Sequence, residues 1–291
     1  MSAAWKWLRR NAILIYAGFA ILYMLIPISV IAVFSFNDPL GKFNFTWQGF
    51  TTQYWQEAFS IPELNEAMLL SLQLAALTTI IATILGTMIA LALVRHDFFG
   101  RYGANFLIVI PMATPEVVIG AALLSMFLIY GINLGFTTLL IAHVMFSISF
   151  VVVVVRSRLI GFDRSLEEAA RDLGATPWTT FRTVTLPLLS PGLIGAALLA
   201  FALSIDDFVI SNFNAGDKVT FPLFIFGAAV RGIPVQAYVL ATILFVVSVA
   251  AMAFVVWQQR RAEQMASVLP DDDVDTGLAA LASGQRPVAG A

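Results

Sequence analysis

Apolar segments long enough to cross a lipid bilayer recur along almost the whole chain. The first, from Ile13 to Phe34, would span roughly 33 Å as a helix, which is enough for the hydrocarbon core. Hydrophobic residues make up 59% of the 291 residues and charged residues only 12%, whereas charged residues make up about 25% of an average soluble domain. We therefore expect an all-α integral membrane protein without a separate soluble domain.

Periodicity and length indicate six transmembrane helices. The expected spans are 12–34, 67–94, 104–130, 134–155, 187–212 and 236–257. Six spans place both termini on one side. If that side is the cytoplasm, only Lys42, Lys218 and Arg231 of the 16 basic residues lie outside. This bias follows the positive-inside rule and predicts an N-in/C-in topology. The expected location is a bacterial inner membrane.

The expected organisation follows from these spans. Residues 1–11 form a cytoplasmic N-terminus, and 12–260 form the transmembrane domain, with a periplasmic loop at 35–66 and a cytoplasmic loop at 156–186. The first span is too long for a cleaved signal segment, so we expect it to be retained. The periplasmic loop is expected to hold one short helix near 53–59. The acidic, then Ala- and Gly-rich tail 261–291 is expected to be disordered.

The cytoplasmic loop 156–186 carries its own helix punctuation. Asp163 can cap the start of a helix, and Gly174 can end it in a left-handed conformation. Thr176 followed by Pro177 then supplies a second N-cap with proline at the first helical position. The pattern predicts two short helices separated by a sharp glycine turn.

The first of these helices has a charged face and a face with little side-chain bulk. Arg164 with Glu168 and Glu167 with Arg171 are spaced i,i+4, and each pair would add a few tenths of a kcal/mol. The Ala169–Ala170 pair leaves a surface suited to close approach by another protein. On these observations alone, an amphipathic helix lying on the membrane is an equal alternative.

The residues of this loop resemble the EAA loop of ABC importer permeases. Glu168-Ala169-Ala170, Gly174, Val184 and Leu186-Pro187 match the spacing of that motif, with Val184 where the family usually has Ile. The resemblance implies a type I importer permease fold, in which this loop docks as a coupling helix on a separate ATPase dimer. The implied ATPase-coupling residues are Glu168, Ala169, Ala170, Arg171, Asp172, Gly174, Ala175, Leu186 and Pro187.

The chain itself is not expected to be an enzyme. It contains no G-x-x-x-x-G-K-[ST] phosphate-binding loop, so ATP and Mg²⁺ would be bound by the partner ATPase. We expect no cofactor, no metal site and no nucleic-acid partner for this chain.

Three carboxylates fall at or near membrane depth: Glu116, Asp206 and Asp207. Each would cost roughly 2.5 to 3.5 kcal/mol at the centre of a helix, so a lipid-facing position is disfavoured. Glu116 follows Pro111 and Pro115, which should break or kink the third span; it is alternatively a structural residue at the end of that helix.

On a continuous fifth helix Asp207 would belong to a polar stripe, which favours Asp207 over Asp206 as the residue lining the pore. The stripe consists of Ser204, Asp207, Ser211 and Asn214. No Lys or Arg lies at depth in the expected spans, and His143 is a lone histidine. The carboxylates are therefore expected to lack a partner within the chain, which leaves a cationic substrate or a cation on a second subunit.

Two segments narrow the resemblance to the spermidine/putrescine permeases, in the second permease position. They are the stretch from Pro115 through Ala175 and the sequence FALSIDDFVISNF at 201–213. The resemblance covers about 65–260 and implies a heterodimer with a homologous permease, an ATPase dimer and an extracytoplasmic substrate-binding protein. The expected substrate path consists of Asp207, Asp206, Ser204, Ser211 and Glu116.

Other functions remain open from the sequence. Permeases for iron, thiamine or phosphonate compounds share the EAA loop. An ion-coupled secondary transporter using Asp207 and Glu116 is an alternative from another class, but it leaves the EAA spacing unexplained. A membrane enzyme is disfavoured because His96 and His143 are far apart and no catalytic motif accompanies them.

Overall fold

A computed structural model describes residues 3–41 and 43–266, which form helices joined by loops, with one isolated antiparallel bridge between Asn37 and Phe50. The helices are α1 (Ala3–Phe34), α2 (Gln53–Gln56), α3 (Pro62–Arg95), α4 (Arg101–Ala113), α5 (Glu116–Ile129), α6 (Phe136–Ile160), α7 (Ser165–Asp172), α8 (Pro177–Thr180), the π-helical turn Phe181–Thr185, α9 (Leu186–Ile205), α10 (Val209–Asn214), α11 (Phe221–Ala229) and α12 (Val235–Ala266). Two compact units divide within α12, after Val246.

The expected all-helical transmembrane fold is confirmed. Among the described residues, five helices are long and apolar enough to cross a membrane, and the bent pair α4 and α5 can supply a sixth span. That pair bends by 110°, as the prolines predicted. Thr114 is extended because it precedes Pro115, whereas Pro111 stays inside α4.

The expectation of one continuous fifth span at 187–212 is wrong at both ends. The helical segment begins at Pro177, capped by Thr176, and ends at Ile205, after which α10 is a separate short helix. The apolar run marked only the part inside the membrane, so it missed the cytoplasmic extension. The break at 206–208 arises because adjacent aspartates compete for backbone N–H groups and favour helix ends.

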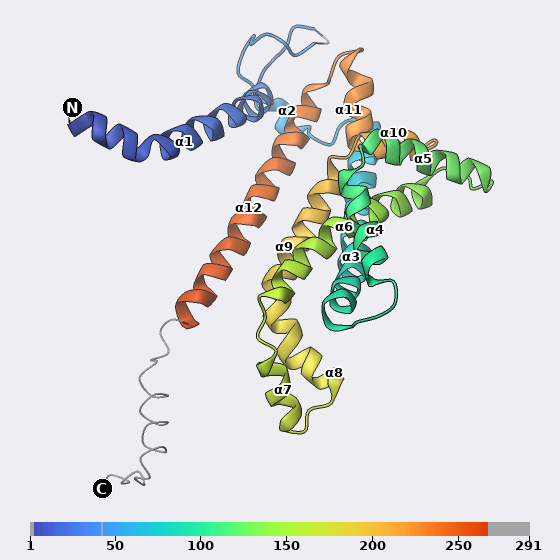
Figure 1. Cartoon of the computed structure of the whole chain (residues 1–291). Coiled ribbons are helices and arrows are strands. Elements are labelled where there is room, and N and C mark those ends of the chain that lie inside the picture. The colour runs from blue at the N-terminus through green and yellow to red at the C-terminus, as the bar shows by residue number, and fades with distance from the viewer. Residues whose placement is uncertain (1–2, 42, 267–291) are drawn as a thin grey trace. The chain divides into compact units, whose positions relative to one another are not determined.

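The central packing unit consists of α3, α6 and α9, which lie side by side (Figure 1). Their shared core is built from alanine, valine and leucine residues: Ala82, Ala90, Leu93, Val151, Val152, Val155, Leu159, Leu189, Ala196 and Ala200. Small residues let helices approach closely in a membrane. At Gly86 on α3, a Cβ atom would lie only 2.6 Å from Val151 Cγ1 on α6. The three-helix unit therefore depends on the absence of a side chain there.

The two short cytoplasmic helices and the glycine turn between them are confirmed. Gly174 has a φ of +87°, and Thr176 Oγ1 accepts a hydrogen bond from the backbone N–H of Thr179 at 3.2 Å. Asp163 Oδ1 accepts from the backbone N–H of Ser165 at 2.9 Å. This bond to the ionised form lowers the pKa of the Asp163 carboxyl. Figure 1 shows α7 and α8 at one end of α9 and α10 beyond the other.

The segments outside this unit match the expectations in part. The short helix expected in loop 35–66 is α2. In the segment before α2, the buried side chain of Asn37 forms hydrogen bonds with Asn44, Thr46 and Gln48. The second compact unit includes the end of α12, where Arg261 stacks over Trp257 at 3.8 Å. Helix continues to Ala266, beyond the expected start of the tail at 261. The remainder of the expected tail, 267–291, lies outside the described residues.

A matched pair of glycine substitutions tests the close approach of α3 and α6. Gly86→Ala should lower the melting temperature of the detergent-purified protein, because the new methyl group overlaps Val151 and overpacking costs about 1 to 3 kcal/mol. Gly195→Ala in α9 is the control, since a Cβ there meets nothing within 4 Å. Equal melting temperatures for the two variants would contradict the packing assigned to Gly86.

Candidate functional site

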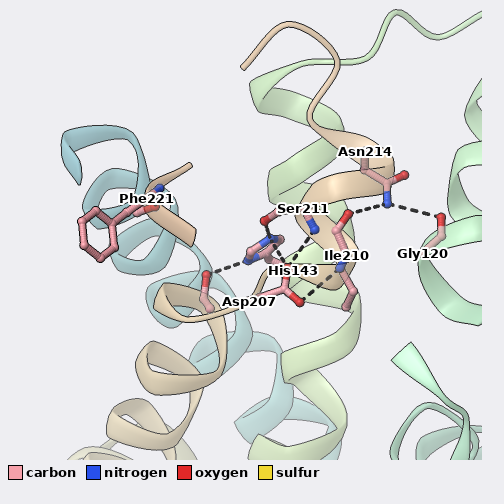
Figure 2. Close-up of polar contacts among 9 residues, drawn as sticks. Gly120, His143, Asp207, Ile210, Ser211, Asn214 and Phe221 are labelled. Carbon is pink, nitrogen blue, oxygen red and sulfur yellow. Dashed lines mark hydrogen bonds and ion pairs between the residues drawn. The ribbon is translucent and has the colours of Figure 1, made fainter. Parts of the chain in front are cut away.

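The first candidate site is the break between α9 and α10, where Asp207 is buried. Its two carboxylate oxygens accept backbone hydrogen bonds from Ile210 at 3.2 Å and Ser211 at 2.8 Å (Figure 2). The side chain thereby satisfies the first free N–H groups of α10. Such bonds are needed wherever a helix is interrupted inside a membrane. Asp207 is therefore held by the protein backbone and is only 9% exposed.

His143 on α6 supplies a further partner for this carboxylate. Its Nε2 lies 3.4 Å from Asp207 Oδ2 and 3.0 Å from Ser211 Oγ, while its Nδ1 lies 2.8 Å from Ser204 Oγ. A neutral ring with its proton on Nε2 can donate toward Asp207 and Ser211 and accept from Ser204. One buried imidazole thus contacts α9, the break and α10.

This arrangement corrects the expectation that the carboxylates lack a partner within the chain. Asp207 is paired with His143, a residue 64 positions earlier by the numbering of the sequence. The sequence contained a usable signal, since His143 was the sole titratable basic candidate in the expected spans. The packing of α6 against the break, which brings the two together, was not visible in the sequence.

The polar stripe expected on the fifth span faces protein rather than an open cavity of this chain. Ser204, Ser211 and Asn214 are all buried. Asn214 Nδ2 donates to Ile210 O at 2.9 Å and lies 3.4 Å from Gly120 O on α5 (Figure 2). On the other side, Thr138 Oγ1 donates to Asn214 O at 2.8 Å. These bonds connect α10 to both α5 and α6.

Asp206 has the opposite environment from its neighbour. It is exposed, and no side chain in the described part of the chain forms an ion pair or hydrogen bond with it. It lies at the edge of a groove of about 470 Å³. The groove is otherwise apolar and is lined by Ile205, Phe208, Phe221, Pro222, Ile225, Phe226, Ala229 and Leu244. The rings of Phe208 and Phe226 are 4.6 Å apart between centroids.

Glu116 brings a third carboxylate to this region. It is the first residue of α5, directly after the 110° bend, and it is exposed. Asp207 and Asp206 lie near enough to interact electrostatically with it. The two helix interruptions therefore bring together the three carboxylates singled out in the sequence. Among the described residues, no group of His, Asp and Glu side chains is arranged to hold a metal ion.

The second candidate site is the cytoplasmic loop with α7. Glu168, Ala169, Arg171, Asp172 and Gly174 are exposed. Ala170, Ala175 and Leu186 are partly buried, and Pro187, at the start of α9, is exposed. The expected docking residues thus leave much of their surface available.

Neither expected i,i+4 pair on α7 is an ion pair in this part of the structure. Glu167 instead pairs with Arg95 at the end of α3 and accepts a hydrogen bond from the Thr185 hydroxyl. Arg164 donates to the backbone oxygen of Val94 at 2.9 Å. Tertiary partners prevail because the local pairs would add only a few tenths of a kcal/mol. Sequence reasoning did not single out Arg95 or Thr185, which lie far from Glu167 along the chain.

Comparison with known proteins places the chain in one family. The family model described as "Binding-protein-dependent transport system inner membrane component" matches residues 82–264. The chain is 38% identical over 229 residues to the spermidine/putrescine transport system permease protein PotC of Haemophilus influenzae, covering 78% of this chain and 88% of the relative. It is 37% identical over 253 residues to the putrescine transport system permease protein PotI of Escherichia coli K12, covering 84% and 88%.

Solved structures agree at the level of the fold. A chain of a bacterial ABC transporter involved in the import of the acidic polysaccharide alginate superposes with a TM-score of 0.64 at 16% identity, covering 89% of this chain and 99% of that one. A chain of an amino acid ABC transporter superposes with a TM-score of 0.54 at 20% identity, covering 72% and 98%. The expected permease fold is thus confirmed. By sequence and fold, this chain belongs to the family of binding-protein-dependent transport system inner membrane components, the permease subunits of ABC importers.

Proposed function

We propose that this permease subunit forms half of the translocation path of an ATP-driven polyamine importer. The observation that carries the proposal is the groove in which an unpaired carboxylate, Asp206, lies beside three phenylalanines. Relatives named as spermidine/putrescine and putrescine permeases support the same substrate class. A permease for iron, thiamine or a phosphonate, and an ion-coupled transporter, are less well supported.

The chemistry of the groove suits a flexible chain bearing several ammonium groups. Asp206 offers a charge-assisted hydrogen bond to an ammonium group, and the faces of Phe208 and Phe226 attract cations. The apolar wall accommodates the methylene groups between the charges. Glu116 adds a second exposed carboxylate nearby, so a substrate with spaced charges can contact both.

The two aspartates then have different roles. Asp206 is the residue expected to contact substrate, because it is exposed and no side chain among the described residues pairs with it. Asp207 belongs to the path as the residue that shapes it, with Ser204 and Ser211 completing its contacts through His143. This division changes the preference drawn from the polar stripe, which rested on a continuous helix.

The remaining partners follow from the same proposal. A homologous permease subunit would complete the path, and an extracytoplasmic binding protein would deliver the polyamine. An ATPase dimer would bind ATP and Mg²⁺ and dock on the coupling residues from Glu168 to Ala175, with Leu186 and Pro187 leading into α9. The topology is N-in/C-in, so that the basic loop 156–186 faces the cytoplasm.

Uptake measurements test the function directly. Labelled spermidine and putrescine should accumulate in vesicles that contain the whole transporter and its binding protein. Accumulation should occur only when ATP is supplied on the side of the membrane that carries the ATPase. Vesicles lacking this chain are the control. Transport that continues without ATP would refute the proposal and favour an ion-coupled transporter.

Substitution of the two aspartates separates their roles. Asp206→Asn should raise the spermidine concentration for half-maximal uptake about tenfold, because hydrogen bonds to charged groups contribute about 1.5 kcal/mol or more. Its melting temperature should not change, since Asp206 has no side-chain partner in the described structure. Asp207→Asn should lower both uptake and the melting temperature, because an amide has only one acceptor oxygen for the two N–H groups. Unchanged uptake in both variants would show that neither carboxylate acts in the substrate path.

A second substitution tests ATPase docking. Gly174→Val should release the ATPase from the purified complex, because a β-branched residue strains a backbone with φ of +87° and adds bulk to the docking face. Gly161→Val is the matched control, since Gly161 ends α6 with φ of −82°. Recovery of normal amounts of ATPase with Gly174→Val, together with normal uptake, would exclude Gly174 from docking.

A further inference from the structure

Glu167 is the most deeply buried charged side chain of the cytoplasmic loop, only 6% exposed. Its Oε1 receives hydrogen bonds from two directions, from the Arg95 guanidinium at the last residue of α3 and from the Thr185 hydroxyl. Thr185 is the last residue of the π-helical turn that leads into α9. One carboxylate oxygen therefore joins α7 to two membrane helices.

These bonds are the main polar connection of α7 to the membrane domain. The helix has eight residues, which is too short to be stable alone in water. The second polar connection, from Arg164 to the backbone oxygen of Val94, also reaches the end of α3. Among the bonds of Glu167 in the described structure, only the one from Thr185 comes from the turn that leads into α9, and α9 ends beside the aspartate break.

The burial of the Glu167 carboxylate limits how much its pair with Arg95 can stabilise the fold. A buried ion pair is weak evidence for stability, since its desolvation offsets much of the attraction. In some proteins such a pair instead defines which of several arrangements is adopted. Glu167 also lines a cavity of about 420 Å³, together with Arg95, His96, Arg164, Glu168, Arg171 and Pro177. Four of these side chains carry or can carry positive charge, so Glu167 and Glu168 keep the cavity from being strongly basic.

We propose that Glu167 is a positioning residue that transmits movement of the docked ATPase to the membrane helices. Displacement of α7 moves Thr185 and Arg95 with it because both bond the same oxygen. The movement then passes along α9, which spans about 30 Å, to Ile205 and the groove at Asp206. The π-helical turn before α9 is where the backbone accommodates the shift, since such turns often mark functional positions. This inference rests on the proposed ATP-driven function.

The test uses the reconstituted complex of this chain with its partner permease, ATPase and binding protein. Four variants are compared with the wild type: Glu167→Gln, Arg95→Gln, the Glu167→Gln/Arg95→Gln double variant, and Thr185→Val. Arg101→Gln is the control, because it breaks the exposed pair of Arg101 with Asp97 at the start of α4. The readouts are melting temperature, ATPase retention, the ratio of binding-protein-stimulated to basal ATP hydrolysis, and spermidine uptake per ATP.

The double variant separates coupling from folding. Glu167→Gln leaves the Arg95 charge unpaired, and Arg95→Gln leaves the buried Glu167 charge unpaired, so the melting temperature of each single variant should fall. The double variant removes both charges and should recover stability. We nevertheless expect the stimulation ratio and the uptake per ATP to remain roughly fivefold or more below wild type in the double variant, within the usual range of coupling between sites. Thr185→Val should give the same uncoupling, with the Arg95 pair intact. Arg101→Gln should match the wild type.

Two results would overturn the inference. In the first, coupling returns together with stability in the double variant, which would make Glu167 a structural anchor only. In the second, Thr185→Val keeps wild-type uptake per ATP. If the wild-type complex neither binds the ATPase nor takes up spermidine in an ATP-dependent manner, the proposed function itself is refuted.

Discussion

Interrupting a helix inside a membrane requires other partners for the freed backbone groups, and in this protein the carboxylate of Asp207 provides them. By accepting the N–H groups of Ile210 and Ser211, it allows α9 to end and α10 to begin within the packed interior. His143 holds this carboxylate from α6. The position of α10, the exposure of Asp206 and the groove beside it all depend on that interruption.

The second interruption has a different chemical cause and a related result. Proline produces the 110° bend between α4 and α5, and the bend places Glu116 at the start of a helix near the aspartates. Two unrelated local devices, a proline and a pair of aspartates, thus bring acidic side chains from distant segments to one region. The α3, α6 and α9 unit supports both, because its close packing at Gly86 fixes α6 against α3.

The charged residues divide by whether the chain itself satisfies them. Glu167 and Asp207 are buried and have partners in the chain. Asp206 and Glu116 are exposed, and no side chain in the described structure pairs with them. Exposed carboxylates of this kind are available to the cationic substrate proposed for the groove. Glu167 and Asp207 lie near opposite ends of α9. In the proposed transport cycle, movement is received at the first of these positions and delivered at the second.

Local sequence patterns were enough to predict the membrane class, the approximate location of most spans, the proline bend and the two capped cytoplasmic helices. They also carried the resemblance of the cytoplasmic loop to the EAA motif. These features depend on hydrophobic length, helix caps and local spacing, all of which are properties of neighbouring residues. Which carboxylate is free and which charges are paired depends instead on how the helices pack against one another. Arg95 and Glu167 are 72 residues apart, and His143 and Ser204 are 61 apart. Contacts across such distances depend on how helices pack, and local pattern carries no information about that packing.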